Sequence, residues 1–381
     1  MKNNIELNKR QTRNQTFQYL EALAIIMVID DHVGTRIGFL SSIFPYNSFY
    51  MPLLVFISGY FYHKKPIKKY LIHKTKKLFL PYMVWNIIGN GIAYILKCLG
   101  IVDWYCSINL SSLKYCLING PLSSINGASW FVIMLFYVSI VYNIFSNIFK
   151  THSLERDIVF LMGYIGIGSG ALVLCMKGYN TGIYLPILKT AFYLQFYHIG
   201  YFFHNYLETY VQSLKKTKVC LGCIFINVVL TCIYGGDINF IATSGMGNFK
   251  SWYLPLITSI TGILFWYMVI DFLAKKIGEH YLIDFIAQNT FTIMETHLLF
   301  VNIPNFYVFF RIMKGIQSYP DFDIQRFRGG AWFRYNENTR LIGFLCGMCG
   351  SLLVISMIKQ IKYRVLLSKK RLSTQIAEKR I

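Results

Sequence analysis

Long apolar segments follow one another along this chain of 381 residues and are separated by short polar stretches. A helix needs about 20 mostly apolar residues to cross the hydrocarbon core of a bilayer. We expect crossing segments over residues 17–33, 44–62, 78–100, 129–149, 158–176, 184–203, 219–234, 252–274, 285–301 and 341–358. Only 14% of the residues are charged, against about 25% in a typical soluble domain. The sequence therefore predicts an all-α, polytopic membrane protein with about ten transmembrane helices.

Basic residues gather between the apolar segments, and they predict an orientation. With both termini in the cytoplasm, 26 of the 38 Lys and Arg residues lie on the cytoplasmic side, as the positive-inside rule requires. The formal net charge of +21 is also typical of nucleic-acid binding. Charges that flank membrane segments are instead explained by topology and by lipid headgroups. We expect membrane lipids and no nucleic acid as partners, and a multi-pass location in a bacterial inner membrane.

The domain organisation follows from the same pattern. We expect one membrane domain over residues 1–358 and a basic cytoplasmic tail over residues 359–381. The tail is predicted either to lie on the membrane surface or to form a solvated helix. The pairs Cys220/Cys223 and Cys346/Cys349 lie in apolar segments without a second ligand pair nearby, which favours packing over metal binding. We predict no metal site.

Ionisable groups in the first apolar segment are the main candidates for chemistry, because such groups are costly inside a bilayer. Glu21 and His32 stand eleven residues apart, which places them on one helix face about 16 Å from each other. His32 is expected near the outer end of the helix, where an imidazole can act as a general base. Asp30 or Asp31 could orient it, although neighbouring side chains point about 100° apart. A partner from another helix is an equal alternative.

Other polar or small residues mark the later segments. The candidates for binding a substrate or donor are Glu21, Ser58, Gly59, Lys77, Trp130, His198, Glu295 and His297. Hydrogen bonding between helices would explain His198 as well, and interfacial anchoring would explain Trp130. An outer loop is expected over residues 302–340. Its Arg and aromatic side chains suit either an anionic glycan or lipid headgroups, and they are Arg326, Arg328, Trp332, Arg334 and Tyr335.

Six motifs occur in a fixed order along the chain. They are His32, MPLLVFISGY at residues 51–60, KKLFLPYMVW at 76–85, SWF at 129–131, FYHIGY at 196–201 and NTFTIMETH at 289–297. In this order they resemble acyltransferase family 3, the polytopic membrane acyltransferases that modify surface polysaccharides, and in particular its fucose 4-O-acetylase-like branch. The resemblance implies an acyl-CoA donor, usually acetyl-CoA, which is a substrate and not a bound cofactor. It also implies a sugar or lipid-linked glycan as acceptor.

We therefore expect an O-acyltransferase in which His32, with Asp31 and Asp30 beside it, removes the proton of a sugar hydroxyl. Many family members carry Arg or Lys at the position of Glu21, so a donor phosphate would need another cation here, either Arg13 or the lysines of the cytoplasmic loop that we expect over residues 64–77. Glu295 also stands where the family is usually apolar. The alternatives are a transporter or flippase for a lipid-linked glycan and a glycan polymerase, and hydrolysis of a thioester by the purified protein would distinguish the enzyme from both.

Overall fold

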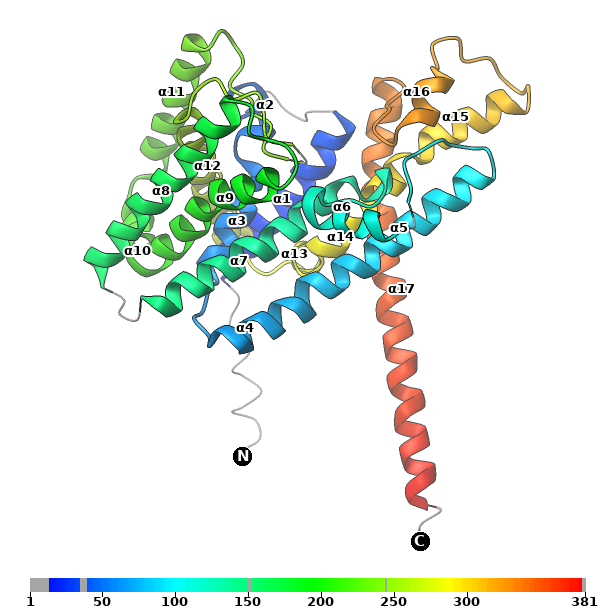
Figure 1. The fold of residues 1–381 in the computed structure, drawn as a ribbon, viewed down its shortest axis with the longest axis horizontal. Coiled ribbons are helices and arrows are strands. Elements are labelled where there is room, and N and C mark those ends of the chain that lie inside the picture. The colour runs from blue at the N-terminus through cyan, green and yellow to red at the C-terminus, as the bar shows by residue number, and fades with distance from the viewer. Residues whose placement is uncertain (1–13, 35–39, 108, 150–152, 244, 379–381) are drawn as a thin grey trace.

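Helices make up most of the protein (Figure 1). The computed structural model describes residues 14–378 apart from 35–39, 108, 150–152 and 244. In chain order, the α-helices are α1 (Gln15–Val33), α2 (Leu40–Ile43), α3 (Tyr50–Tyr60), α4 (Ile67–Lys74), α5 (Leu80–Cys98), α6 (Leu110–Asn119), α7 (Trp130–Ile148), α8 (Leu154–Met176), α9 (Tyr184–Phe202), α10 (Glu208–Ser213), α11 (Lys216–Ile233), α12 (Leu254–Ile277), α13 (Tyr281–Ala287), α14 (Thr290–Val301), α15 (Ile303–Met313), α16 (Ile324–Gly329) and α17 (Glu337–Glu378). Short 3₁₀-helices cover Tyr46–Ser48 and Ser124–Ser129, and π-helical turns cover Thr75–Phe79 and Phe203–Leu207.

Six stretches of helix in the described residues are long and apolar enough to cross a membrane. They are Ile67–Cys98, Ser124–Ile148, Leu154–Met176, Lys216–Ile233, Leu254–Ile277 and Thr339–Ser368. A seventh is possible if Leu40–Ser48 and Tyr50–Tyr60, which meet at a bend of 66°, together form one span. The protein is thus a polytopic all-α membrane protein, as predicted. The predicted count of ten spans is not confirmed.

If the bent pair is counted as a span, three of the ten predicted segments remain, and their helices are polar or short. α1 and α9 have 19 residues each, but α1 carries three carboxylates and α9 carries Lys189, Gln195 and His198. α14 has only 12 residues. α1 packs against α3, α12, α13, α14 and α17, and most of its side chains are buried. Neighbouring helices therefore shield its charged groups from lipid, so a low mean hydropathy is compatible with a place inside the bundle.

The basic stretch of residues 64–77 was expected to be a loop, and this expectation is wrong. The chain turns at Pro66 and then runs as continuous helix over Ile67–Cys98, through α4, a π-helical turn and α5. Lysine is a good helix former, so a run of lysines beside an apolar segment extends the helix instead of ending it. The five lysines from Lys68 to Lys77 are consequently held on a helix, whereas Lys64 and Lys65 precede it.

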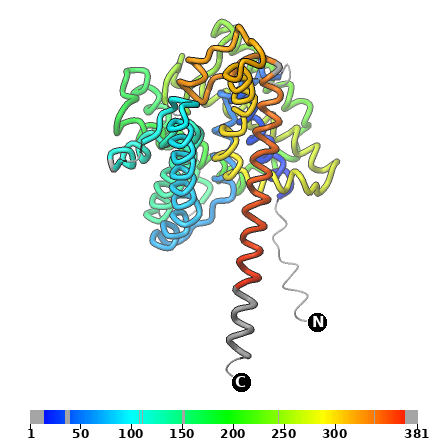
Figure 2. Tube along the Cα trace, turned by 90° about the vertical axis from the view of Figure 1, so that its right-hand side faces the viewer, coloured from blue at the N-terminus to red at the C-terminus, as the bar shows by residue number. Residues whose placement is uncertain are grey.

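The C-terminal tail is also helical. α17 is a single helix of 42 residues that passes through the predicted boundary at residue 358 without a break. Its C-terminal part runs away from the rest of the bundle (Figure 2). The tail therefore continues the last span, and no separate surface helix follows it in the described residues.

Two glycines bring α3 and α9 into close contact at the centre of the bundle. A Cβ on Gly59 would overlap the carbonyl of Tyr197, and one on Gly200 would overlap the carbonyl of Phe56. Gly34, with a φ of +78°, ends α1, as a left-handed glycine commonly does. It places His32 in the last turn of α1.

Candidate functional site

α1 and α14 lie side by side and bring two imidazoles together. Nδ1 of His32 lies 2.6 Å from Nε2 of His297. The planes of the two rings are nearly parallel, with an angle of 3° between them. The side chain of His297 is fully buried. His32 and His297 were both predicted as site residues, and the structure joins them into one dyad.

The hydrogen bonds of the dyad fix where its protons lie when both rings are neutral. Nδ1 of His297 is 2.9 Å from the carbonyl oxygen of Ile293, which can only accept, so Nδ1 carries the hydrogen. Nε2 of His297 then has a lone pair and accepts from Nδ1–H of His32. This leaves Nε2 of His32 without a hydrogen, and an imidazole nitrogen in that state is a proton acceptor.

The two aspartates before His32 take other partners. The hydroxyl of Tyr50 donates to Oδ2 of Asp31 at 3.2 Å, and the hydroxyl of Tyr46 donates to Asp30. Because Nδ1 of His32 is engaged by His297, the group that orients the ring is an imidazole from another helix and not a neighbouring carboxylate. The sequence allowed both arrangements, since side chains of consecutive helical residues diverge by about 100°.

The segment after α16 covers the end of α1 that carries the dyad. The ring of Trp332 meets that of His32 edge to face, with centroids 5.0 Å apart. Nε of Arg334 donates to the carbonyl oxygen of His32 at 3.1 Å. Burial lowers the pKa of Arg334 to about 10, so the guanidinium remains positively charged at neutral pH. These contacts link two residues of the predicted outer loop to the predicted base.

Glu295 lies on the same helix as His297 but faces a different element. Its Oε2 accepts from Oγ of Ser129 at 2.5 Å and from Nδ2 of Asn126 at 3.4 Å. Sequence reasoning singled out Trp130 at this place, yet the neighbouring serine makes the contact. The indole of Trp130 instead lies beneath the ammonium of Lys189, 5.1 Å from its ring centre. Within the SWF motif, the residue that contacts Glu295 is therefore Ser129, one position before the predicted Trp130.

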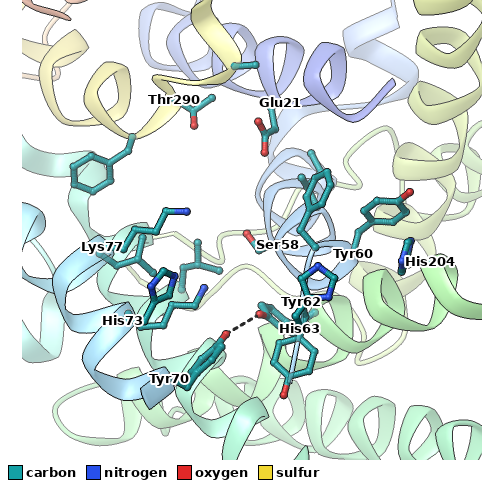
Figure 3. Close-up of a pocket in the computed structure, with 18 of the residues that line it drawn as sticks. Glu21, Ser58, Tyr60, Tyr62, His63, Tyr70, His73, Lys77, His204 and Thr290 are labelled. Carbon is teal, nitrogen blue, oxygen red and sulfur yellow. Dashed lines mark hydrogen bonds between the residues drawn. The ribbon is translucent and has the colours of Figure 1, made fainter. Parts of the chain in front are cut away.

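A cavity of about 800 Å³ opens at the other end of α1. Figure 3 shows Glu21, Ser58, Lys77 and Thr290 directed into it from different helices. Its basic lining residues are His63, Lys65, His73, Lys74, Lys77 and His204. Its aromatic lining residues are Tyr60, Phe61, Tyr62, Tyr70, Tyr197 and Phe291. The cavity therefore combines a cationic wall with aromatic surface.

The predicted binding residues divide between this cavity and the packed interior. Glu21, Ser58 and Lys77 line the cavity, whereas Gly59 packs against the backbone of α9. His198 is fixed between helices, with Nδ1 2.8 Å from the hydroxyl of Tyr142 and Nε2 3.0 Å from the carbonyl oxygen of Asp157. These bonds join α7, α8 and α9, which is the structural alternative that the sequence left open for His198.

Both π-helical turns of the described chain border the cavity. The turn Thr75–Phe79 supplies Lys77, and the turn Phe203–Leu207 supplies His204. A π-helical turn inserts an extra residue into a helix and redirects the side chains around it, and such turns are frequent at functional sites. No sequence signal predicted either turn.

α1 and α14 connect the cavity to the dyad. Glu21 from α1 and Phe291 from α14 line the cavity, and His32 and His297 lie further along the same two helices. The distance from Glu21 to His32 along the axis is about 16 Å for eleven residues. The cationic cavity and the unprotonated Nε2 of His32 thus lie at different positions along the same two helices, α1 and α14.

A family model described as an acyltransferase domain matches residues 14–359. The chain belongs to this acyltransferase family. The matched region of the acyltransferase contains the cavity, the dyad and the covering segment with Trp332. No curated protein and no solved structure matches the chain.

Proposed function

We propose that this membrane acyltransferase moves an acyl group, such as acetyl, from acyl-CoA in the cytoplasm to a sugar hydroxyl on the outer side of a bacterial inner membrane. The acceptor is a sugar of a surface polysaccharide or of its lipid-linked precursor. The observation that carries the proposal is the placement of a cationic cavity and a histidine dyad along the same pair of helices. A donor held at one end and an acceptor entering from the other then meet at His32.

The cationic wall suits a donor with several phosphates. Lys65, Lys74 and Lys77 line the cavity, and ammonium groups bind phosphates as point charges. Lys74 lies over the ring of Tyr70, 5.4 Å from its centre, so its position is fixed by packing. These lysines supply the positive charge that many family members place at the position of Glu21. Arg13, the other candidate for that role, lies outside the described residues.

The dyad suits the chemistry of transfer. Nε2 of His32 accepts the proton of the sugar hydroxyl while the oxygen attacks the thioester carbonyl carbon. The carbon–sulfur bond then breaks, the acyl group remains on the sugar oxygen, and the coenzyme A thiolate leaves. The imidazolium of His32 can return its proton to that thiolate. His297 holds the ring of His32 in the required tautomer through the bond to its Nδ1.

Purified protein in lipid nanodiscs, supplied with acetyl-CoA and the glycan fraction of its host membrane, tests the proposal. We expect release of free coenzyme A thiol together with transfer of a radiolabelled acetyl group to the glycan. His32→Ala should lower both by about 10²- to 10⁴-fold, whereas His280→Ala should change neither, because His280 is exposed at the start of α13. Undiminished transfer by His32→Ala would reject the base role. A wild-type protein that binds glycan but never consumes thioester would favour the transporter reading.

A further inference from the structure

We propose that the exposed face of Trp332 is the binding platform for the acceptor sugar ring, and that Arg334 binds an oxygen of the same sugar. This acceptor subsite lies at the outer end of α1, and it deepens the proposed function by naming where and how the acceptor binds. The ligand class is a pyranose residue with one apolar C–H face.

Trp332 combines exposure with contact to the reacting group. Half of its surface, 50%, is exposed, although its ring centre lies 5.0 Å from that of His32. The exposed part of this large aromatic side chain therefore lies directly beside the dyad, where an acceptor must bind if His32 is to take its proton. The face of an indole carries the negative part of the ring quadrupole, which attracts the weakly positive C–H groups of a sugar ring.

The indole of Trp332 is held in place by packing against Gly127. A Cβ on Gly127 would overlap Cζ2 of Trp332, so the indole lies directly against the backbone of the 3₁₀-helix Ser124–Ser129. The same short helix bears Asn126 and Ser129, which bind Glu295 on α14. The platform is therefore attached to the helix that carries the second histidine of the dyad, and its position relative to His32 is defined before a ligand arrives.

Arg334 adds a donor that has no partner within the described residues. Its Nε binds the carbonyl oxygen of His32, and its Nη1 binds Asn302 and the carbonyl oxygens of Ala331 and Phe333. Its Nη2 is buried and makes no hydrogen bond in the structure. A buried N–H group without an acceptor is costly, so a small movement of the covering side chains that lets a sugar oxygen reach Nη2 would be compensated by the new hydrogen bond. One side chain thus anchors the segment and offers a hydrogen bond beside the base.

A stacking platform and a single donor define the kind of acceptor. Stacking selects a ring with an apolar face but does not distinguish among its hydroxyls. The distance from the platform to Nε2 of His32 then determines which hydroxyl is acylated. The donor cavity at the other end of α1 does not include Trp332 among its lining residues, so acceptor and donor binding can be measured separately.

The test uses the full-length protein in nanodiscs and methyl pyranosides of the gluco, galacto, fuco and rhamno series as probes. Binding is measured by saturation-transfer NMR without donor, and transfer is measured with radiolabelled acetyl-CoA. We expect Trp332→Ala to raise the KM for the best pyranoside at least tenfold and to remove its saturation transfer. Trp332→Phe should keep most of both. The KM for acetyl-CoA and hydrolysis of acetyl-CoA in the absence of acceptor should stay unchanged in both variants.

Trp252→Ala is the matched control, because Trp252 is also 50% exposed but lies before α12. It should leave every parameter unchanged. The proposal is overturned if Trp332→Ala binds pyranosides as the wild type does, if no pyranoside binds the wild type, or if the variant loses donor hydrolysis in parallel with transfer. The last result would make the indole a structural support of His32. Pyranoside binding by a wild-type protein that never consumes acetyl-CoA would refute the proposed function and leave the subsite standing.

Discussion

Replacing His297 with alanine removes the acceptor that fixes the proton on Nδ1 of His32. In the structure, this bond is 2.6 Å long, and His297 is itself held by the carbonyl oxygen of Ile293 at 2.9 Å. Without it, His32 is free to carry its hydrogen on Nε2, where it can no longer accept a proton. Glutamine at position 297 offers a carbonyl oxygen near the former Nε2, so His297→Gln should restore the acceptor.

The expected magnitudes separate orientation from catalysis. One neutral hydrogen bond contributes about 0.5–1.5 kcal/mol, which corresponds to a fall in kcat of about 2- to 13-fold at about 1.36 kcal/mol per factor of ten. Loss of a general base costs about 10²- to 10⁴-fold. His32→Ala should therefore be at least about tenfold less active than His297→Ala, and His297→Gln should recover part of the loss without a change in the KM for acetyl-CoA.

The assay is transfer of radiolabelled acetyl to glycan by protein in nanodiscs, with kcat and KM determined for the wild type and the three variants. Thermal unfolding of each variant provides the control for folding, because His297 is fully buried. The reasoning is refuted if His297→Ala is as inactive as His32→Ala while its unfolding midpoint is unchanged. In that case His297 would itself exchange the proton. A fully active His32→Ala would refute the dyad as a whole.

Three further predictions concern donor binding and packing. Lys77→Gln should raise the KM for acetyl-CoA about fivefold at low ionic strength and less in high salt. Lys177→Gln should not change it in the same kinetic assay, because Lys177 lies at the end of α8 and does not line the cavity. Gly59→Ala should lower the free energy of unfolding by about 1–3 kcal/mol, because the added Cβ would overlap the backbone of α9. Gly91→Ala is the control: the added Cβ has open space, so this variant should raise the unfolding midpoint slightly. Asp271→Asn should destabilise the protein by about 1–3 kcal/mol, since Lys216 and Lys275 both bind this carboxylate, and chemical denaturation of the purified variant measures the loss.

Apolar length and charge distribution were sufficient to predict the fold class and most helices. They did not settle the number of spans, because hydropathy does not say whether a helix is surrounded by lipid or by protein. α1 is the instructive case, since its carboxylates are tolerated only because five other helices surround it. The lysine-rich stretch was misassigned for a similar reason. Charge indicated a cytoplasmic location, whereas helix propensity determined that Ile67–Lys74 continues into the next helix.

For the candidate site, too, the sequence identified individual residues but not the contacts between them. His32 and His297 were identified singly, because ionisable groups in apolar segments stand out. Their bond joins residues 265 positions apart, and a single sequence carries no signal for such a pair. The roles of Ser129 and Asn126 were equally hidden, since short polar residues are common at helix starts. His198 and Gly59 were singled out as well, although both pack between helices, because residues that hold helices together can be of the same types as residues that bind a ligand.

Glu295 departs from the family pattern, and its surroundings predict what a substitution will do. Its Oε2 is bound by Ser129 and Asn126, whereas its Oε1 is buried without a partner in the described structure. A buried carboxylate is costly when it is only partly satisfied. We expect Glu295→Gln to keep both bonds through its amide oxygen, to retain transfer within about threefold by the same hydrogen-bond reasoning, and to be at least as stable as the wild type. Glu295→Ala should lose stability, because it leaves Ser129 and Asn126 without their acceptor. If Glu295→Gln instead loses most of its transfer activity with an unchanged unfolding midpoint, the carboxylate takes part in the reaction, and the departure from the family pattern is catalytic.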